Sequence, residues 1–287
     1  MKVVKTIEDA RRAVREARAA GKRIGLVPTM GALHAGHLSL IDAAAADCDF
    51  VAVSIFVNPT QFGAGEDLAA YPRTPEADLA ACRARGVELV FMPAAEAMYP
   101  DGELTTVSVR DLCRSLCGRS RPGHFDGVCT IVAKLFNIIQ PQAAYFGAKD
   151  FQQAVVIRRM AADLNFPVEI VVCPTVREPD GLAMSSRNAY LSPAHRSQAV
   201  ALYESLQLGA KMIRRSRPPA PQVVAAVREH IAAHAPDGEI DYIQIVDPET
   251  LKDVETPEGA ALIALAVKFG DARLIDNMLV DADALRA

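Results

Sequence analysis

The feature that most constrains the fold is a regular alternation of strand-like and helix-like segments in the N-terminal part of the chain. The run FVAVSIFV, residues 50–57, is continuously apolar and rich in β-branched residues, which is typical of a strand covered on both faces. Similar strand-like runs occupy residues 23–29, 87–93, 143–147 and 168–174. Helix-like segments occupy residues 6–20, 38–46, 76–85, 127–139 and 152–163. This rhythm predicts a Rossmann-like, doubly wound parallel sheet with helices on both faces.

The pattern changes after Ser186. A helix-like segment at residues 193–215, with Ser192 as its N-cap, is followed by a Pro-rich turn and a second helix-like segment at 223–235. Three strand-like runs close the chain, at residues 239–247, 261–269 and 272–280. We therefore predict an α/β domain over residues 1–186. A smaller α+β domain over residues 187–287 should hold two helices and a small antiparallel sheet.

Composition excludes several classes of protein. A chain of 287 residues can bury a hydrophobic core large enough to be stable without disulfide bonds or structural metals. The six irregularly spaced cysteines indicate buried free thiols in a reducing, cytoplasmic setting. The N-terminus lacks the apolar core of a signal peptide, and the longest apolar runs are too short to span a membrane. The net charge of -4 argues against a nucleic-acid partner but allows a local basic pocket for a small anion.

The segment PTMGALHAGH, residues 28–37, joins a predicted strand to a helix that should begin near Gly36. A helix N-terminus at the carboxyl edge of a parallel sheet suits a phosphate. His34 and His37 are three residues apart and would share one helical face. The segment is not a P-loop, because no Lys-Ser/Thr pair follows Gly36. Two surface histidines in a turn remain the alternative, but the Pro-Thr-Met-Gly lead-in at the strand end favours an anion site.

Two further strand ends carry polar residues. In NPTQF, Asn58 and Gln61 offer neutral hydrogen-bonding groups that suit hydroxyls and carboxylates. In YFGAKDFQQ, Lys149 could reach a phosphate, Asp150 could cap a helix or bind ribose, and Gln153 follows one turn later. Viewed alone, NPTQF is better explained as a polar loop, and YFGAKDFQQ is explained equally well as a solvated Lys-Asp pair at a helix start.

The segment RPGHFDGV places His124 before a helix, where it could be catalytic or could cap and pack the loop. Cys113, Cys117 and His124 do not have the usual spacing of a zinc site, and no fourth ligand is apparent. We therefore predict no protein-built metal site.

The last polar segment, REPDGLAMSSRNAYLS, places Ser185, Ser186 and Arg187 in a Gly-containing loop. Such a loop can close over a triphosphate, and it can equally be a mobile interdomain linker. Five strand ends with polar, phosphate-compatible residues are hard to explain by packing alone.

The chain resembles the pantothenate synthetase (pantoate–β-alanine ligase) family nearly end to end. The resemblance lies in PTMGALHAGH, SIFVNPTQFGAGEDLAAYPRT, RPGHFDGVCTIVAKLFNIIQPQAAYFGAKDFQQ and AMSSRNAYLS. The first stretch resembles the HIGH signature of nucleotidylyltransferases, and AMSSR stands at the place of their KMSKS signature. Ala183 and Arg187 replace the lysines of that broader pattern, which is also usual in this family.

The resemblance implies an ATP-dependent ligase that adenylates (R)-pantoate and then transfers the pantoyl group to β-alanine. ATP would be a substrate, Mg²⁺ would accompany it, and the protein would be a cytoplasmic homodimer with a C-terminal lid domain. The implied catalytic residues are His34, His37, Lys149, Ser185, Ser186 and Arg187. Implied ATP-site residues are Met30, Gly31, Ala32, Leu33, His34, Ala35, Gly36, His37, Gly147, Ala148, Lys149, Asp150, Val176, Met184, Ser185, Ser186 and Arg187. Gln61 and Gln153 would hold pantoate, with Gln61 also near β-alanine.

Two other functions fit parts of the pattern. A simple nucleotidyltransferase would stop after joining a nucleotide to an acceptor. The second alternative is a protein without catalytic activity that senses a nucleotide or binds tRNA. The presence of His34, His37 and Lys149 argues against a nucleotide sensor, and the net charge argues against tRNA binding.

Overall fold

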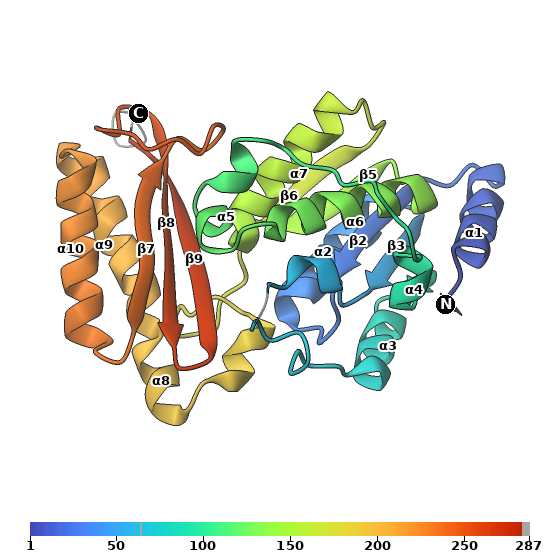
Figure 1. Ribbon diagram of the computed structural model, residues 1–287, viewed down its shortest axis with the longest axis horizontal. Coiled ribbons are helices and arrows are strands. Elements are labelled where there is room, and N and C mark those ends of the chain that lie inside the picture. Colours follow the sequence, from blue (N-terminus) through green and yellow to red (C-terminus); the bar gives the residue numbers. More distant parts are fainter. Residues whose placement is uncertain (64, 283–287) are drawn as a thin grey trace. The chain divides into compact units, whose positions relative to one another are not determined.

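The computed structural model describes residues 1–63 and 65–282 (Figure 1). The chain divides into two compact units, each of which is described by itself. Unit 1 comprises Met1–Cys113, Arg121–Ala148 and Gln153–Pro174, and unit 2 comprises Arg114–Ser120, Lys149–Gln152 and the described part of Thr175–Ala287. The predicted domain boundary at Ser186 lies inside unit 2, and the domain ranges 1–186 and 187–287 remain predictions.

Unit 1 contains a six-stranded sheet in which every neighbouring pair is parallel, as predicted. In spatial order its strands are β1 (Lys2–Val4), β4 (Leu89–Phe91), β3 (Phe50–Ile55), β2 (Ile24–Thr29), β5 (Ala143–Gly147) and β6 (Glu169–Cys173). From β2 the chain first builds outward through β3 and β4, and later adds β5 and β6 on the other side. This reversal makes the carboxyl ends of β2 and β5 the topological switch point, where ligands bind in open α/β sheets.

The helices of the N-terminal half are α1 (Ile7–Ala19), α2 (Ala35–Asp47), α3 (Pro75–Ala84), α4 (Ala95–Met98), α6 (His124–Ile139) and α7 (Phe151–Asp163). Thr6 caps α1, because its side chain accepts a hydrogen bond from the Asp9 N–H. Helix α2 contacts α3, while α1 contacts α6. Alternate residues of β3, Val51 and Val53, lie in one buried cluster with Ile41 of α2, so the period of two buries one face of β3 under that helix.

Unit 2 contains an antiparallel sheet of β7 (Glu239–Val246), β8 (Ala260–Phe269) and β9 (Ala272–Asp281), as predicted. Its helices are α5 (Cys117–Ser120), α8 (Pro193–Gln198), α9 (Val200–Ser216) and α10 (Ala220–His234). The single helix predicted over residues 193–215 is therefore divided at Ala199, although Ser192 caps its first part as expected. Gly209 lets α9 approach its neighbours, since a Cβ there would lie 3.0 Å from Ile263 of β8 and 3.1 Å from Val227 of α10. Within the described residues, no helix is long and apolar enough to span a bilayer.

Candidate active site

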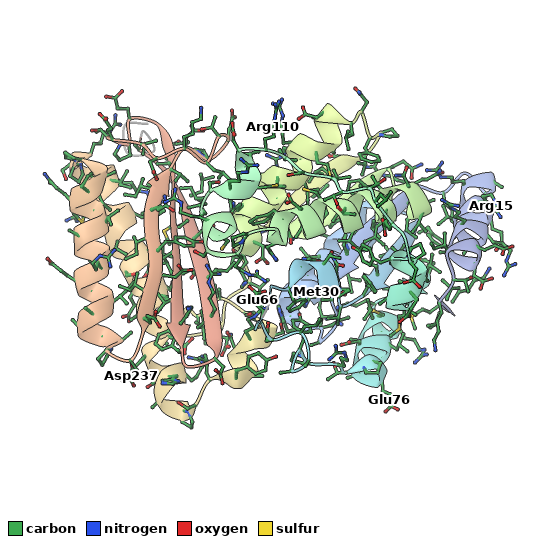
Figure 2. The ribbon with its side chains drawn as sticks, viewed as in Figure 1. Arg15, Met30, Glu66, Glu76, Arg110 and Asp237 are labelled. Carbon is green, nitrogen blue, oxygen red and sulfur yellow. The ribbon has the colours of Figure 1, made fainter. Side chains whose placement is uncertain are left out.

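The turn after β2 brings the chain from the sheet into α2. Gly31 and Ala32 both have positive φ angles, +85° and +50°. A Cβ on Gly31 would also lie 3.1 Å from Ile55, so the turn requires glycine there for conformation and for space. Met30, labelled in Figure 2, begins this turn directly after β2.

A buried carboxylate holds the turn in place. Asp78 of α3 is 2% exposed, and its two oxygens accept the Ala32 N–H at 3.0 Å and the Leu33 N–H at 2.8 Å. The Thr74 hydroxyl donates to the same carboxylate at 3.1 Å. The backbone N–H groups of Ala32 and Leu33 thus both donate to the Asp78 carboxylate within the protein. Sequence reasoning missed Asp78, because nothing in a helix-like segment indicates a contact with a distant turn.

The two histidines of the turn lie together, as their spacing predicts. His34 is the N-cap of α2, and its Nδ1 accepts the Gly36 N–H at 3.1 Å. The His37 Nδ1 accepts the His34 N–H at 3.4 Å, and the ring centroids are 4.1 Å apart. A neutral imidazole that accepts at Nδ1 carries its proton on Nε2. Each ring therefore has an Nε2–H group that can donate to an anion at the switch point.

The NPTQF segment forms a short 3-10 helix, η1 (Pro59–Gln61), that packs on α6. Asn58 is 1% exposed, and its Nδ2 donates to the Gln61 Oε1 at 3.0 Å and to the Gly127 carbonyl at 3.1 Å. Its Oδ1 accepts the Thr60 hydroxyl at 3.0 Å. Asn58 therefore orients the Gln61 amide, so that the Gln61 Nε2 is the end that can donate to a substrate oxygen. Sequence reasoning treated Asn58 and Gln61 as equivalent polar groups and missed the role of Gly127.

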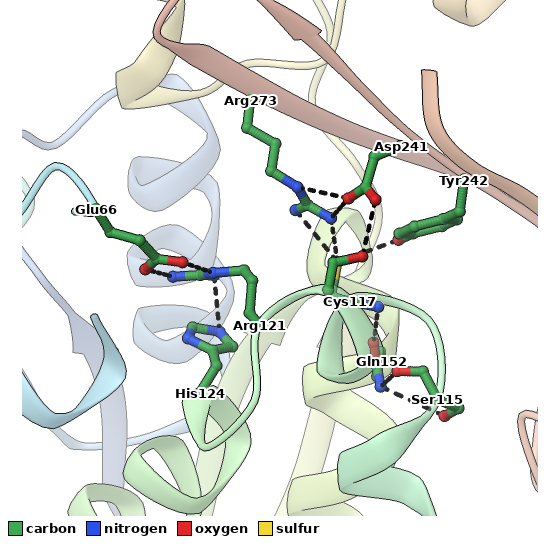
Figure 3. A network of polar contacts seen from close by, with 10 residues as sticks. Glu66, Ser115, Cys117, Arg121, His124, Gln152, Asp241, Tyr242 and Arg273 are labelled. Carbon is green, nitrogen blue, oxygen red and sulfur yellow. Dashed lines mark hydrogen bonds and ion pairs between the residues drawn. The ribbon is translucent and has the colours of Figure 1, made fainter. Parts of the chain in front are cut away.

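His124 lies beside Arg121, which in turn faces Glu66 (Figure 3), and it also contacts the NPTQF segment. Its Nδ1 lies 2.7 Å from the Gln61 carbonyl oxygen, and its Nε2 lies 3.2 Å from Nη1 of Arg121. Arg121 also forms an ion pair with Glu66. Of the two roles left open by the sequence, the structure favours a residue that holds the loop.

No metal centre is apparent. Residues 1–63 and 65–282 contain no group of three or more His, Cys, Asp and Glu side chains that could hold a metal ion. All six cysteines are free thiols; five are buried, as predicted, and Cys48 is half-buried.

In unit 2, Lys149 and Ser185 line one small pocket, together with Asn188 and Asp276. The Lys149 ammonium lies 3.5 Å from the Asp150 carboxylate. The backbone carbonyl of Lys149 accepts a hydrogen bond from the Asn277 side chain of β9 at 2.8 Å. Lys149 of GAKDFQQ and Ser185 of AMSSR are therefore brought together within this unit.

The AMSSR loop is tied to the sheet of unit 2. Arg177 forms a two-pronged ion pair with the buried Asp276 of β9, at 2.6 and 2.9 Å, and its guanidinium stacks on Tyr203. Ser185 caps a 3-10 helix, η4 (Ser186–Tyr190), by accepting the Arg187 N–H at 3.2 Å. Sequence reasoning did not find the Arg177–Asp276 pair, because its members are far apart in the chain.

The remaining predicted residues differ in their surroundings. The Met184 N–H donates to the Val176 carbonyl at 3.0 Å, so these two residues are neighbours in unit 2. Gly147 ends β5, and a Cβ there would meet nothing within 4 Å. Gln152 is buried, and its amide bonds Ser115 and Cys117 within unit 2, whereas Gln153 is half-buried and belongs to unit 1.

A doubly wound sheet with two imidazoles at its switch point defines an α/β enzyme of the nucleotide-binding class. Comparison with known proteins makes this more specific. The family model described as pantoate-beta-alanine ligase matches residues 2–279. A pantothenate synthetase from Moorella thermoacetica is 53% identical over 283 residues, covering 99% of this chain and 100% of that protein. One from Acetivibrio thermocellus is 50% identical, covering 98% and 100%.

Comparison with solved structures indicates the same family. The crystal structure of pantothenate synthetase from Thermus thermophilus has a TM-score of 0.92 at 46% identity, covering 97% of this chain and 99% of that chain. Pantoate-beta-alanine ligase from Francisella tularensis, complexed with beta-gamma ATP and beta-alanine, has a TM-score of 0.80 at 34% identity, covering 97% of each chain. The chain belongs to the pantoate–β-alanine ligase family.

Proposed function

We propose that this ligase condenses (R)-pantoate with β-alanine in two steps at the expense of ATP. In the first step a pantoate carboxylate oxygen attacks the α-phosphorus of ATP, which forms pantoyl adenylate and releases diphosphate. In the second step the β-alanine amine attacks the pantoyl carbonyl carbon, the C–O bond to AMP breaks, and the amine loses a proton. The observation that carries this proposal is the whole-length family match together with the paired imidazoles at the switch point.

The first step needs no protein base, because the carboxylate is already a nucleophile. We assign to the protein the positioning of the reactants and the stabilisation of charge on the phosphates. The Nε2–H groups of His34 and His37 are the proposed hydrogen-bond donors to the phosphates. His37 is also the proposed proton donor, a role that requires its imidazolium form. Lys149 and Arg187 would balance the charge of the departing diphosphate, with hydrogen bonds from Ser185 and Ser186.

The remaining contacts to ATP are proposed for groups around these residues. They would come partly from the backbone of residues 30–37 and 147–150, and from Val176 and Met184. Gln61 and Gln153 are the proposed ligands of pantoate, and Gln61 would also lie near β-alanine. The buried, pre-oriented amide of Gln61 supports its part of this assignment.

Mg²⁺ is proposed as a companion of ATP rather than as a resident ion. Mg²⁺ usually keeps several waters and binds through substrate phosphates and one or two carboxylates. Among the described residues there is no group of three or more His, Cys, Asp and Glu side chains that could hold an ion. Bound to the phosphates, Mg²⁺ would neutralise part of their charge.

We further propose that the enzyme acts as a homodimer in the cytoplasm, that residues 187–287 serve as a lid domain, and that its partners are small molecules rather than nucleic acid. The family resemblance supports these proposals. Sedimentation of the purified protein tests the dimer.

A direct experiment tests the reaction. Purified protein would be incubated with (R)-pantoate, β-alanine and MgATP, and pantothenate would be measured by mass spectrometry. We expect pantothenate and AMP in equal amounts, with AMP release that depends on the amine. AMP release that is independent of β-alanine would contradict the ligase assignment, whereas diphosphate release without AMP or pantothenate would favour a simple nucleotidyltransferase.

A further inference from the structure

Gln61 is held at its main chain as well as at its side chain. Its carbonyl oxygen is the acceptor for two side chains at the start of α6, the Nη2 of Arg121 just before the helix at 3.1 Å and the Nδ1 of its first residue, His124, at 2.7 Å. Both donors are half-buried. An interior loop carbonyl with two strong donors has little freedom to move.

Arg121 is itself fixed by a carboxylate. Its Nε and Nη2 donate to the two oxygens of Glu66 at 2.7 and 2.6 Å, a parallel arrangement in which both groups are held in one plane (Figure 3). The Glu66 and Arg121 side chains are only 26% and 15% exposed. Hydrogen bonding to Arg121 lowers the pKa of Glu66 to about 2, so the ion pair persists throughout the physiological range.

The hydrogen bonds also define the state of His124. A carbonyl oxygen can only accept, so the His124 Nδ1 must carry a hydrogen toward Gln61. The opposite nitrogen, Nε2, faces Nη1 of Arg121, which can only donate. His124 is therefore a neutral ring with a fixed tautomer, and the bond that reaches the substrate-binding loop comes from Nδ1.

We propose that Glu66, Arg121 and His124 form a clamp that sets the position of the Gln61 main chain and thereby aims its amide at pantoate. These are positioning residues, since none of them needs to touch substrate. The inference rests on the proposed role of Gln61. A misplacement of about 1 Å in a substrate-positioning group costs on the order of 10²-fold in rate, so a modest loosening of the clamp should be measurable.

The test compares two amides at position 124. An asparagine places its Nδ2 where the histidine Nδ1 lies, and can still donate to Gln61. A glutamine reaches instead toward the place of Nε2 and loses that bond. We expect KM for pantoate to rise about threefold or less in His124→Asn and roughly tenfold or more in His124→Gln, with KM for ATP unchanged within twofold in both.

Glu66→Gln tests the other end of the clamp, and we expect a similar rise in KM for pantoate. Glu103→Gln is the matched control. Glu103 is also a half-buried carboxylate of unit 1, but its ion-pair partner is Lys134, which is not one of the donors to the Gln61 carbonyl. It should leave KM for pantoate unchanged. Equal KM values for His124→Asn and His124→Gln, or an equal rise in the control, would show that these residues act only on general stability.

Gln61→Ala separates this inference from the proposed function. If Gln61→Ala raises KM for pantoate while the two position-124 variants are alike, the clamp is wrong and the role of Gln61 stands. If Gln61→Ala leaves KM for pantoate unchanged, the role of Gln61 is wrong and the clamp falls with it. If Gln61→Ala raises KM for pantoate and the two position-124 variants also differ, then introducing His124→Gln into Gln61→Ala should raise this KM little further.

Discussion

Gly127 sits inside α6, yet alanine should be harmful there. A Cβ at this position would lie 2.4 Å from the Thr60 carbonyl oxygen and 2.7 Å from the Thr60 carbonyl carbon. Ordinary contacts begin at 3.4 Å, so either the helix or the NPTQF segment must move by about 1 Å. Both atoms belong to the backbone, which cannot turn aside as the end of a side chain can.

The magnitude follows from opposing terms. Alanine in place of glycine favours a helix by about 1 kcal/mol. Overpacking against backbone costs about 1–3 kcal/mol. A shift would also weaken the bond from Asn58 to the Gly127 carbonyl, worth about 1 kcal/mol. We expect Gly127→Ala to lower the free energy of unfolding by about 1–3 kcal/mol and to reduce kcat/KM for pantoate by roughly tenfold or more.

Urea unfolding and steady-state kinetics would measure both effects. Gly209→Ala is the matched control, since it also lies inside a helix but would meet side-chain methyl groups of Ile263 and Val227 that can give way. It should leave kcat/KM for pantoate unchanged. A Gly127→Ala enzyme with the parent's stability and kinetics would refute the reasoning, because the close approach would then carry no constraint.

Three other predictions concern separate features. His37→Ala should lower turnover on the order of 10²–10³-fold while the protein stays folded by circular dichroism; turnover within a few-fold of the parent would remove His37 from the chemistry. Asp276→Ala should lower the free energy of unfolding by about 3 kcal/mol, the low end for breaking a buried ion pair, because the half-buried Arg177 guanidinium loses its carboxylate but keeps its bond to the Gly181 carbonyl; a urea titration of the variant that matches the parent would contradict this. Glu66 has a lowered pKa in the folded state, about 2, so its contribution to stability is present above its unfolded pKa of roughly 4.3 and is lost as pH falls toward 2. The difference in unfolding free energy between the parent and Glu66→Gln should therefore shrink over that interval, and a constant difference would contradict the assignment.

Much of the fold could be predicted because its signals are local. Continuous apolar runs such as residues 50–57 identify strands buried on both faces, and Thr6 and Ser192 mark helix starts through their own side chains. The strand β1 escaped prediction because it is three residues long and lies at the edge of the sheet, where its outer side has no strand partner and its residues stay partly exposed.

The proximity of the two candidate-site histidines could be predicted from sequence, but the groups that support the candidate site could not. His34 and His37 stand three residues apart, so their proximity follows from helix geometry. Asp78 and Glu66 act on residues of other segments, and their partners are fixed only when the sheet assembles. Gly127 gave no signal either, because the requirement for glycine comes from the backbone of Thr60 rather than from α6 itself.

The capping hydrogen bonds of α2 tie the chemistry of the two imidazoles to the folding of a helix. The two Nδ1 atoms accept the Gly36 and His34 N–H groups, so the residues proposed to donate to the phosphates also close the first turn of α2. A substitution that removes either imidazole therefore takes from this turn one acceptor of a backbone N–H group. Loss of activity in His34→Ala should then be accompanied by local fraying of α2, visible as faster amide exchange at Gly36.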